Sequence, residues 1–377
     1  MRIAYVLTSL GVGGAERQVL ALAERMAARG HAVSLVVLRA RQAEEWPAPS
    51  SLVRAVRLDM RKTPASFLAG LWKARRFLRE TRPDLIHSHT YPANMTARLL
   101  RLAGIAPLGC APAPIVSTIH NVYEGSWLRM LAYRLTDPLS RRTTAVSQAA
   151  ADRFVRLKAI PARKCFVLAN GIDTAEFAPS PERRARAREE MGAGDEFVWL
   201  AVGRIVPAKD YPNLLRAFAQ VHAALPAARL WIAGEAAGSG AAEVQALAAE
   251  LGLGASVRWL GLRRDMPALL DAADGFVLAS AWEGMPLAVG EAMAMEKPVV
   301  ATDVGGVREL VGDAGVLVPA KNPDSLAQAM LALMRNPREA RASLGRSARE
   351  RIQSLFSIDA KADEWEALYR AVLEGKR

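Results

Sequence analysis

Short apolar runs alternate with helix-period segments along this 377-residue chain, and the alternation restarts near its middle. In the first half, the runs that read as buried strands are residues 3–8, 33–38, 85–88, 115–119, 144–146 and 165–168. In the second half they are residues 197–202, 229–233, 257–260, 275–278, 299–301 and 316–318. Helical spacing between them is clearest in residues 15–28, 66–80, 93–102, 211–224, 241–251 and 325–334. This order predicts the α/β class, with parallel sheets covered by helices.

The chain is long enough for two domains, each with its own core. Residues 179–195 are rich in charge with Pro and Gly, and we expect the boundary within residues 172–195. The predicted domains are residues 1–175 and 176–357, followed by a last helical segment at 358–377.

No apolar run reaches the roughly 18–20 residues that a bilayer span requires. The apolar part of the N-terminus is too short for a signal peptide and reads as a first strand. Cys110 and Cys165 are isolated and the five His residues are scattered, so neither a metal site nor an oxidising compartment is indicated. We therefore expect a cytoplasmic protein.

Positive charge is concentrated in the first half of the chain. Residues 1–175 carry 26 Lys and Arg against 11 Asp and Glu, whereas the remainder carries 24 against 27. A basic half indicates an anionic partner, unless it reflects only an Arg-rich composition. Because no nucleic-acid-binding motif and no basic–aromatic interleaving is present, we favour an anionic membrane surface or a lipid pyrophosphate over nucleic acid.

Two acids eight residues apart, Glu283 and Glu291, lie in the segment from Ser280 to Val304. The apolar spacing predicts a helix that contains Glu291, which places Glu283 in the loop before its N-terminus. Free N–H groups at a helix start suit a phosphate, and a carboxylate further along suits a ribose diol. This arrangement favours a nucleotide sugar. On spacing alone, a helix-capping Glu283 and a solvent-facing Glu291 fit equally well.

Two cations follow the first predicted strand of the second half, Arg204 and Lys209. One loop apart, they can converge on two phosphates and neutralise the charge that develops on a leaving diphosphate. In the first half, the glycines of GVGGAER open a helix directly after the first strand, where a backbone can approach a phosphate or sugar oxygen closely. His120 ends a predicted parallel strand, which is where α/β folds bind ligands.

These motifs together resemble the retaining glycosyltransferases of family 4, of the bacterial surface-polysaccharide type. The matching blocks are E-x7-E at 283–291, G-R-x4-K at 203–209, GGAER at 13–17 and NGID at 170–173. The resemblance implies the GT-B fold, in which two Rossmann-like domains face each other across a deep cleft and a C-terminal helix crosses back to the first domain. Glu296 departs from the family pattern, which often has Gly at that turn.

The resemblance also implies roles for residues of this chain. The residues expected to act on the reacting groups are His120, Arg204, Lys209 and Glu283. The residues expected to bind the donor are Gly13, Gly14, Arg204, Lys209, Arg263, Glu283, Gly284, Met285, Pro286, Leu287 and Glu291. His87, His89 and Asn170 are expected on the acceptor side, although Asn170 fits a purely structural turn equally well.

The predicted function is transfer of a sugar from a nucleotide diphosphate sugar, with UDP favoured, to a glycan or lipid-linked acceptor. The chain contains no Asp-x-Asp, so neither a metal nor another cofactor is implied, and Arg204 with Lys209 can serve the diphosphate instead. A nucleotide-sugar epimerase of the same fold is the alternative enzyme. A non-enzymatic nucleic-acid binder is suggested only by the pI of about 10.1.

Two segments combine apolar and cationic residues at helical spacing, residues 65–82 and 128–142. Such helices can lie on an anionic bilayer, or their apolar positions can simply pack into the core of the first domain. The membrane interpretation predicts peripheral binding at the inner face of the plasma membrane.

Overall fold

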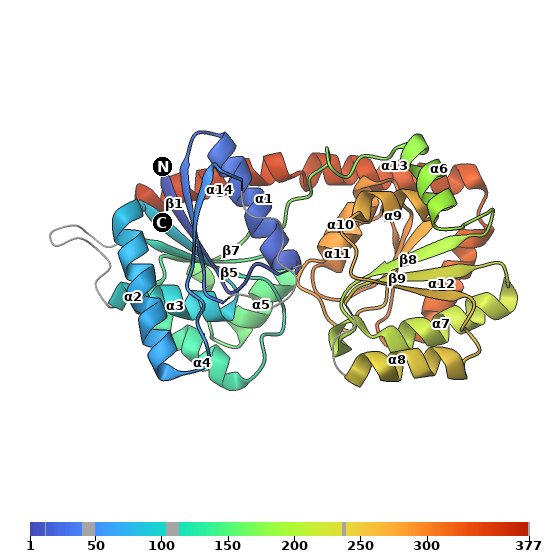
Figure 1. Cartoon of the computed structure of the whole chain (residues 1–377), viewed down its shortest axis with the longest axis horizontal. Helices are drawn as coiled ribbons and strands as arrows, with labels where there is room; N and C mark the ends of the chain where they lie inside the picture. The colour runs from blue at the N-terminus through green and yellow to red at the C-terminus, as the bar shows by residue number, and fades with distance from the viewer. Residues whose placement is uncertain (12, 40–49, 103–112, 236–238, 376–377) are drawn as a thin grey trace. The chain divides into compact units, whose positions relative to one another are not determined.

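The computed structural model describes residues 1–11, 13–39, 50–102, 113–235 and 239–375. They form two compact units, one of Met1–Gly171 with Ile358–Arg377 and the other of Ile172–Ser357 (Figure 1). The chain divides after Gly171 because Ile172 already pairs with Ser357 in a parallel bridge, with its N–H donating to the Phe356 carbonyl at 2.7 Å. Cys110 lies outside the described residues.

The first unit is built on a sheet of seven parallel strands in the order β3-β2-β1-β4-β5-β6-β7. The strands are β1 (Arg2–Leu7), β2 (Ala32–Val37), β3 (Val53–Arg57), β4 (Leu85–His89), β5 (Ile115–Ile119), β6 (Arg142–Ala145) and β7 (Cys165–Val167). The helices are α1 (Gly14–Ala28), α2 (Pro64–Thr81), α3 (Tyr91–Leu102), α4 (Trp127–Thr136), α5 (Gln148–Arg156) and α14 (Ile358–Leu373), with 3₁₀ turns η1 (Asp137–Leu139) and η2 (Ala162–Lys164).

Helices cover both faces of this sheet, as a parallel sheet requires. Helices α1 and α14 pack on one face, where Trp365 and Tyr369 of α14 join the core (Figure 1). Helices α2 and α3 pack on the other face through residues such as Phe77 and Leu100. The last helix therefore belongs to the first unit, although it follows the whole second unit in sequence.

The second unit has six parallel strands in the order β10-β9-β8-β11-β12-β13. The strands are β8 (Val198–Val202), β9 (Arg229–Ala233), β10 (Val257–Gly261), β11 (Gly275–Leu278), β12 (Val299–Thr302) and β13 (Val316–Val318). The helices are α6 (Pro181–Glu190), α7 (Tyr211–Ala224), α8 (Ser239–Glu250), α9 (Met266–Ala272), α10 (Leu287–Ala294), α11 (Val307–Val311), α12 (Pro323–Arg335) and α13 (Arg338–Leu355), with the turn η3 (Pro207–Lys209).

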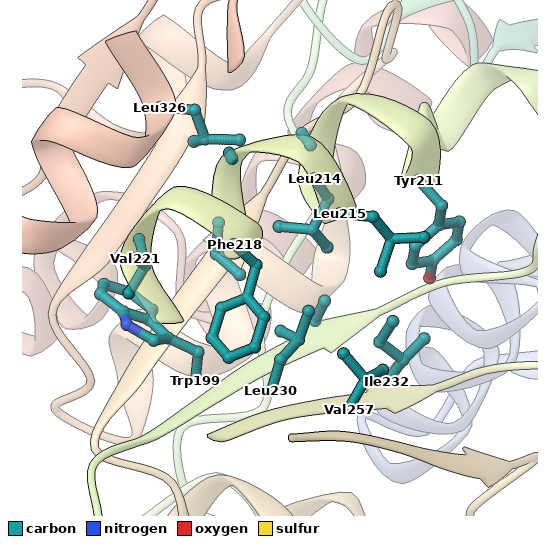
Figure 2. Close-up of a cluster of buried hydrophobic side chains, with 14 of the residues drawn as sticks. Trp199, Tyr211, Leu214, Leu215, Phe218, Val221, Leu230, Ile232, Val257 and Leu326 are labelled. Carbon is teal, nitrogen blue, oxygen red and sulfur yellow. The ribbon is translucent and has the colours of Figure 1, made fainter. Parts of the chain in front are cut away.

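A large apolar cluster joins α7, α8 and α12 to one face of this second sheet. Figure 2 shows Leu215 and Phe218 of α7 above Leu230 and Ile232 of β9, with Trp199 of β8 beside them. All five side chains are buried. At roughly 1.5–3 kcal/mol for each large side chain removed from water, this cluster holds the helices firmly on the sheet.

Several helices begin where a polar residue precedes proline. Thr63, Ser180 and Asn322 each accept a hydrogen bond from a backbone N–H of the first turn, and Pro follows each of them. The side-chain oxygen satisfies an N–H that has no partner within the helix, and Pro at the first position loses nothing because it has no N–H. These starts are therefore local properties of the sequence.

The charged segment near the expected domain boundary contains a helix of the second unit. Helix α6 is held by ion pairs from Arg183 to Asp271 (2.5 Å) and from Arg184 and Arg188 to Asp274 (2.6 and 3.1 Å). Its high charge reflects these partners, which lie more than 80 positions away. Residues 179–195 therefore include a helix of the second unit, which begins at Ile172.

Two further features differ from the sequence prediction. Strand β3 was not predicted, because a five-residue edge strand with two Arg residues lacks a continuous apolar run. The segment 128–142 is not one helix, since α4 ends at Thr136, Pro138 lies in η1 and Arg142 begins β6. No helix among the described residues is long and apolar enough to cross a membrane.

In each sheet the strand order reverses once, between β1 and β4 and between β8 and β11. The loops leaving the carboxyl ends of such strands diverge, and ligands of open α/β sheets bind in the crevice between them. The motif residues predicted from the sequence follow these strands in both units.

Candidate active site

In the second unit, an ion pair joins the loops that follow β8 and β11. Lys209 Nζ lies 2.6 Å from Glu283 Oε1, and the Ser280 hydroxyl donates to the same oxygen at 2.7 Å. The Ala281 N–H also donates to the Ala208 carbonyl at 2.9 Å. The two motifs, 74 positions apart, are thus brought together at the reversal point of the sheet.

Glycines allow the chain to fold tightly around Lys209. A Cβ on Gly203 would lie 2.8 Å from Lys209 Cε, so the lysine stem lies directly against the Gly203 backbone. The Gly203 carbonyl accepts a hydrogen bond from the Tyr211 hydroxyl at 2.6 Å and occupies the place where a Gly234 side chain would begin. The lysine is therefore held against a rigid loop.

Arg204 extends from this same loop. Its side chain is exposed, and it makes no hydrogen bond or ion pair with another residue in the part of the chain that the structure describes. A guanidinium held by a fixed loop and facing solvent is available to an anionic ligand. Its contact with a diphosphate stays a prediction.

Helix α10 begins directly after the loop that carries Glu283. Its N-cap residue, Pro286, offers no side-chain acceptor, so the first-turn N–H groups have no side-chain cap from it. Gly284, Met285, Pro286 and Leu287 are buried, and their contacts with a donor stay predictions. Glu291 lies just over one turn into the helix and is 3% exposed, which rules out the alternative of a solvent-facing acid. Its ribose contact stays a prediction.

Arg263 already has a partner of its own. Its Nε and Nη2 donate to the two carboxylate oxygens of Asp265 at 2.8 and 2.5 Å, and this pairing raises the pKa of Arg263 and lowers that of Asp265. The side chain is bound to its neighbour after β10, so only the backbone of this loop remains for the predicted contact with a base.

In the first unit, helix α1 starts at Gly14 after the N-cap Gly13. The Glu16 carboxylate lies where a Cβ on Gly13 would be, and the Ser9 hydroxyl donates to its Oε1 at 3.1 Å. An acid of the chain itself therefore occupies part of this helix start. Gly14 is exposed, as a backbone contact to a donor requires.

His120 follows β5 and pairs with a second histidine. Its Nε2 lies 3.0 Å from Nδ1 of His89, the last residue of β4. Burial lowers the pKa of His120 to about 4 and also lowers that of His89, so both rings are neutral at pH 7. His89 is 1% exposed, whereas His120 retains contact with solvent. Of the two, His120 is the one that a ligand can reach.

His87 is a core residue, which corrects its expected place on the acceptor side. The side chain is fully buried, with Nδ1 2.6 Å from the Tyr369 hydroxyl and Nε2 2.7 Å from the Thr118 hydroxyl. Burial lowers its pKa well below the usual value. Because side chains alternate between the two faces of a strand, His87 connects the sheet to α14.

In the Asn170–Gly171 turn, the glycine has a structural role. A Cβ on Gly171 would lie 2.7 Å from the Ile358 Cα, and the Gly171 N–H donates to Gln18 Oε1 at 3.0 Å. Glycine is needed because the start of α14 passes against it. Asn170 is 6% exposed, and its acceptor-side role stays a prediction.

Several further polar residues near these strand ends were not predicted from the sequence. The Thr8 and Thr90 hydroxyls meet at 2.6 Å across the β1–β4 reversal point, and Thr90 has a φ of 70°, unusual for a β-branched residue. Glu124 accepts from the Tyr133 hydroxyl at 2.9 Å, and burial raises its pKa to about 7. Thr8, Thr90 and Ser280 each lie just beyond a buried strand, a signal that could have identified them.

Known proteins are similar to both units. Residues 12–176 match the family model "Glycosyltransferase Family 4" and residues 183–351 match "Glycosyl transferases group 1". The D-inositol 3-phosphate glycosyltransferase of Saccharomonospora viridis is 30% identical, over 97% of this chain and 90% of its own length. That of Segniliparus rotundus is 31% identical, over 78% and 67%.

Among solved structures, Anabaena HepE in complex with UDP and glucose aligns with a TM-score of 0.83, over 98% of this chain and 100% of that one, at 23% identity. This likeness and the two parallel sheets confirm the predicted GT-B fold. The two family models and the relatives that match over most of their length give the same assignment from the sequence. The chain belongs to the family 4 type of GT-B glycosyltransferases.

Proposed function

We propose that this glycosyltransferase moves a sugar from a UDP-sugar to a glycan or lipid-linked acceptor, with retention at the anomeric carbon, in surface polysaccharide or glycoconjugate assembly. The observation that carries the donor half of the proposal is the Lys209–Glu283 pair at the reversal point of the second sheet, with Arg204 exposed beside it. A uridine diphosphate donor is favoured because HepE, which shares the fold, was solved with UDP.

In this scheme Arg204 and Lys209 stabilise the charge that develops on the departing diphosphate. Fixed cations act strongly there because they need no reorganisation as the bond breaks. Glu283 is held by Ser280 and Lys209, so its carboxylate is oriented before a sugar binds. His120, neutral at pH 7, offers a hydrogen-bonding group to the sugar rather than a charge.

The proposed reaction needs no metal. The support for this part of the proposal is that the sequence has no Asp-x-Asp and that Arg204 and Lys209 can neutralise the diphosphate instead. The test is activity after treatment with EDTA. We expect it to be largely retained, and complete loss that Mg²⁺ restores would contradict the scheme.

The donor is best identified by thermal shift with a panel of nucleotide sugars, because a ligand at about 100 times its Kd adds roughly 2.7 kcal/mol of stability. The stereochemistry follows from the anomeric coupling in the NMR spectrum of the product. Release of free UDP only when an acceptor is present would support transfer. Conversion of the nucleotide sugar without an acceptor would support the alternative, an epimerase.

The acceptor half of the proposal places the first unit on an anionic membrane. Helix α4 exposes Trp127 (71%), Leu128 (57%) and Leu135 (70%), and helix α2 exposes Leu68 and Trp72 beside several Arg residues. The opposite side of α2 packs into the core, so these exposed positions are not needed for folding. Apolar side chains next to cations are the combination that binds a bilayer interface.

Co-sedimentation with phosphatidylglycerol vesicles tests this surface. We expect binding that fades at high salt and that the double variant Trp127→Asp with Leu135→Asp abolishes. The matched control is Leu355→Asp, since Leu355 is similarly exposed (48%) but belongs to the second unit. Equal binding to neutral and anionic vesicles at low salt would contradict the membrane proposal and leave the transferase proposal intact.

A further inference from the structure

The first unit contains a cluster of cationic side chains at the amino edge of its sheet, opposite to the edge that holds His120. Pro114 directly precedes β5, Arg142 is the first residue of β6 and Lys164 directly precedes β7. These three residues line one cavity of about 680 Å³. Because the strands are parallel, their first residues lie at one edge of the sheet. His120 follows β5 and lies at the other edge. The five residues of β5 separate the two edges by about 16 Å.

Five cationic side chains line this cavity: Arg101, Arg141, Arg142, Arg163 and Lys164. Asp137 neutralises Lys164 at 2.9 Å. Arg101 and Arg141 donate to the main-chain carbonyl groups of Ala113 (3.4 Å) and Gly375 (3.0 Å), which carry no net charge. Several positive charges therefore converge on one space.

Arg142 is the most buried cation of this cavity, and it also donates to the Arg141 carbonyl at 3.3 Å. Its side chain is buried, with the guanidinium 5.2 Å above the ring of Phe166. Burial and the neighbouring charge of Arg141 both lower its pKa. An anion in the cavity would relieve this repulsion, whereas a neutral ligand would not.

The size and lining of the cavity indicate the class of anion. Its volume falls within the range of about 300–1,000 Å³ that is typical of small-molecule sites and exceeds what a single phosphate fills. Arginine forks match phosphate oxygens in pairs. Val372 and Leu373 of α14 add an apolar wall. We propose that this cavity binds a phosphate or diphosphate that carries an organic group, at a site separate from the donor site.

Isothermal titration with inorganic pyrophosphate tests the proposal on the whole chain. The donor loop also attracts diphosphates, so the wild type should show two classes of site. Lys209→Ala should remove one class, and Arg141→Glu with Arg163→Glu should weaken the other at least about tenfold. Arg141 and Arg163 are exposed, which makes these substitutions safer for folding than one at the buried Arg142.

The matched control is Arg61→Glu with Arg156→Glu, which reverses two exposed charges elsewhere in the same unit. Pyrophosphate binding that responds only to Lys209→Ala would overturn the proposal without touching the proposed function. A result in which only the Arg141 and Arg163 pair matters would support the cavity and contradict the donor assignment instead.

Phosphatidylglycerol vesicles identify the source of the anion. If the Arg141 and Arg163 variant loses both pyrophosphate and vesicle binding, the ligand is a lipid headgroup. If it loses pyrophosphate binding alone, the ligand is a free phosphorylated molecule. Retention of pyrophosphate binding at both sites in this variant would refute the cavity proposal in either form.

Discussion

The carboxyl edges of the two sheets use opposite chemistry at the same topological position. In the second unit, charged groups meet where the strand order reverses, with Lys209 and Glu283 in direct contact. In the first unit, the ends of β4 and β5 hold a neutral His89–His120 pair and hydroxyl groups, and the acid on this edge, Glu16, lies after β1. A charged edge suits a diphosphate and a neutral one suits sugar hydroxyls, so one architecture can serve two halves of a transfer reaction.

The two units also differ in net charge and in exposed apolar side chains, and here the first unit is the more charged one. The first unit carries 30 Lys and Arg against 15 Asp and Glu, and the second carries 20 against 23. Among the described residues, every strongly exposed large apolar side chain except Leu355 belongs to the first unit. The unit with the His89–His120 pair thus has the basic and apolar exterior on which the membrane proposal rests.

The largest expected difference between the two units is in their stability at acidic pH. Burial lowers the pKa of His87, His89 and His120, so between pH 6.5 and 5 the unfolded chain binds more protons and the stability of the first unit falls as the pH falls. Glu124, with its raised pKa, acts in the opposite direction, but it is one group against three. Hydrogen exchange should show lost protection in residues 85–89 and 115–119 before residues 275–278. Simultaneous loss in both units would contradict this contrast.

Lys209→Ala should abolish most turnover and leave folding nearly unchanged. Removing one preorganised group that stabilises developing charge typically costs 10²–10³-fold in kcat, or about 2.7–4 kcal/mol. Arg204→Ala should act in the same direction. Steady-state kinetics with the identified donor and a thermal melt measure the two effects separately. Lys321→Ala, an exposed lysine of the same unit, is the control, and equal losses in both variants would refute the assignment.

Glu291→Gln should weaken the binding of both the nucleotide sugar and the free nucleotide. A carboxylate that accepts two hydroxyl protons is replaced by an amide with one acceptor, at an expected cost of about 1.5–3 kcal/mol. Isothermal titration measures it against Glu243→Gln, an exposed acid of the same unit. Unchanged affinity for both ligands would exclude the ribose contact.

Glu296→Gly should stabilise the second unit by about 1 kcal/mol and leave activity unchanged. Glu296 has a φ of 57°, a left-handed conformation that costs non-glycine residues roughly 1–2 kcal/mol. Its carbonyl also packs where a side chain on Gly345 would begin, which keeps this backbone fixed. Chemical denaturation should show the gain, whereas Glu243→Gly within helix α8 should lower stability. A loss in Glu296→Gly would mean that its side chain stabilises the turn.

The sequence predicted the alternating elements well where each strand is a continuous apolar run, as in β8 and β11. It failed where stability comes from partners far along the chain. Helix α6 was not predicted, because its charged residues pair with acids near position 271 rather than following an apolar period. Strand β3 was missed because edge strands are polar by necessity.

The candidate site divides in the same way. Periodicity alone determined that Lys209, Glu283 and His120 follow buried strands, because which residues border a strand depends only on its immediate neighbours. Tertiary structure decided which distant residues meet. Lys209 meets Glu283 across 74 positions, and His87 meets Tyr369 across 282. His87 and His89 look equivalent in the sequence and both are buried, yet His87 pairs with Tyr369 of α14 whereas His89 pairs with His120. Pairing between distant segments depends on strand order and on which helix covers which face, and no local pattern encodes either.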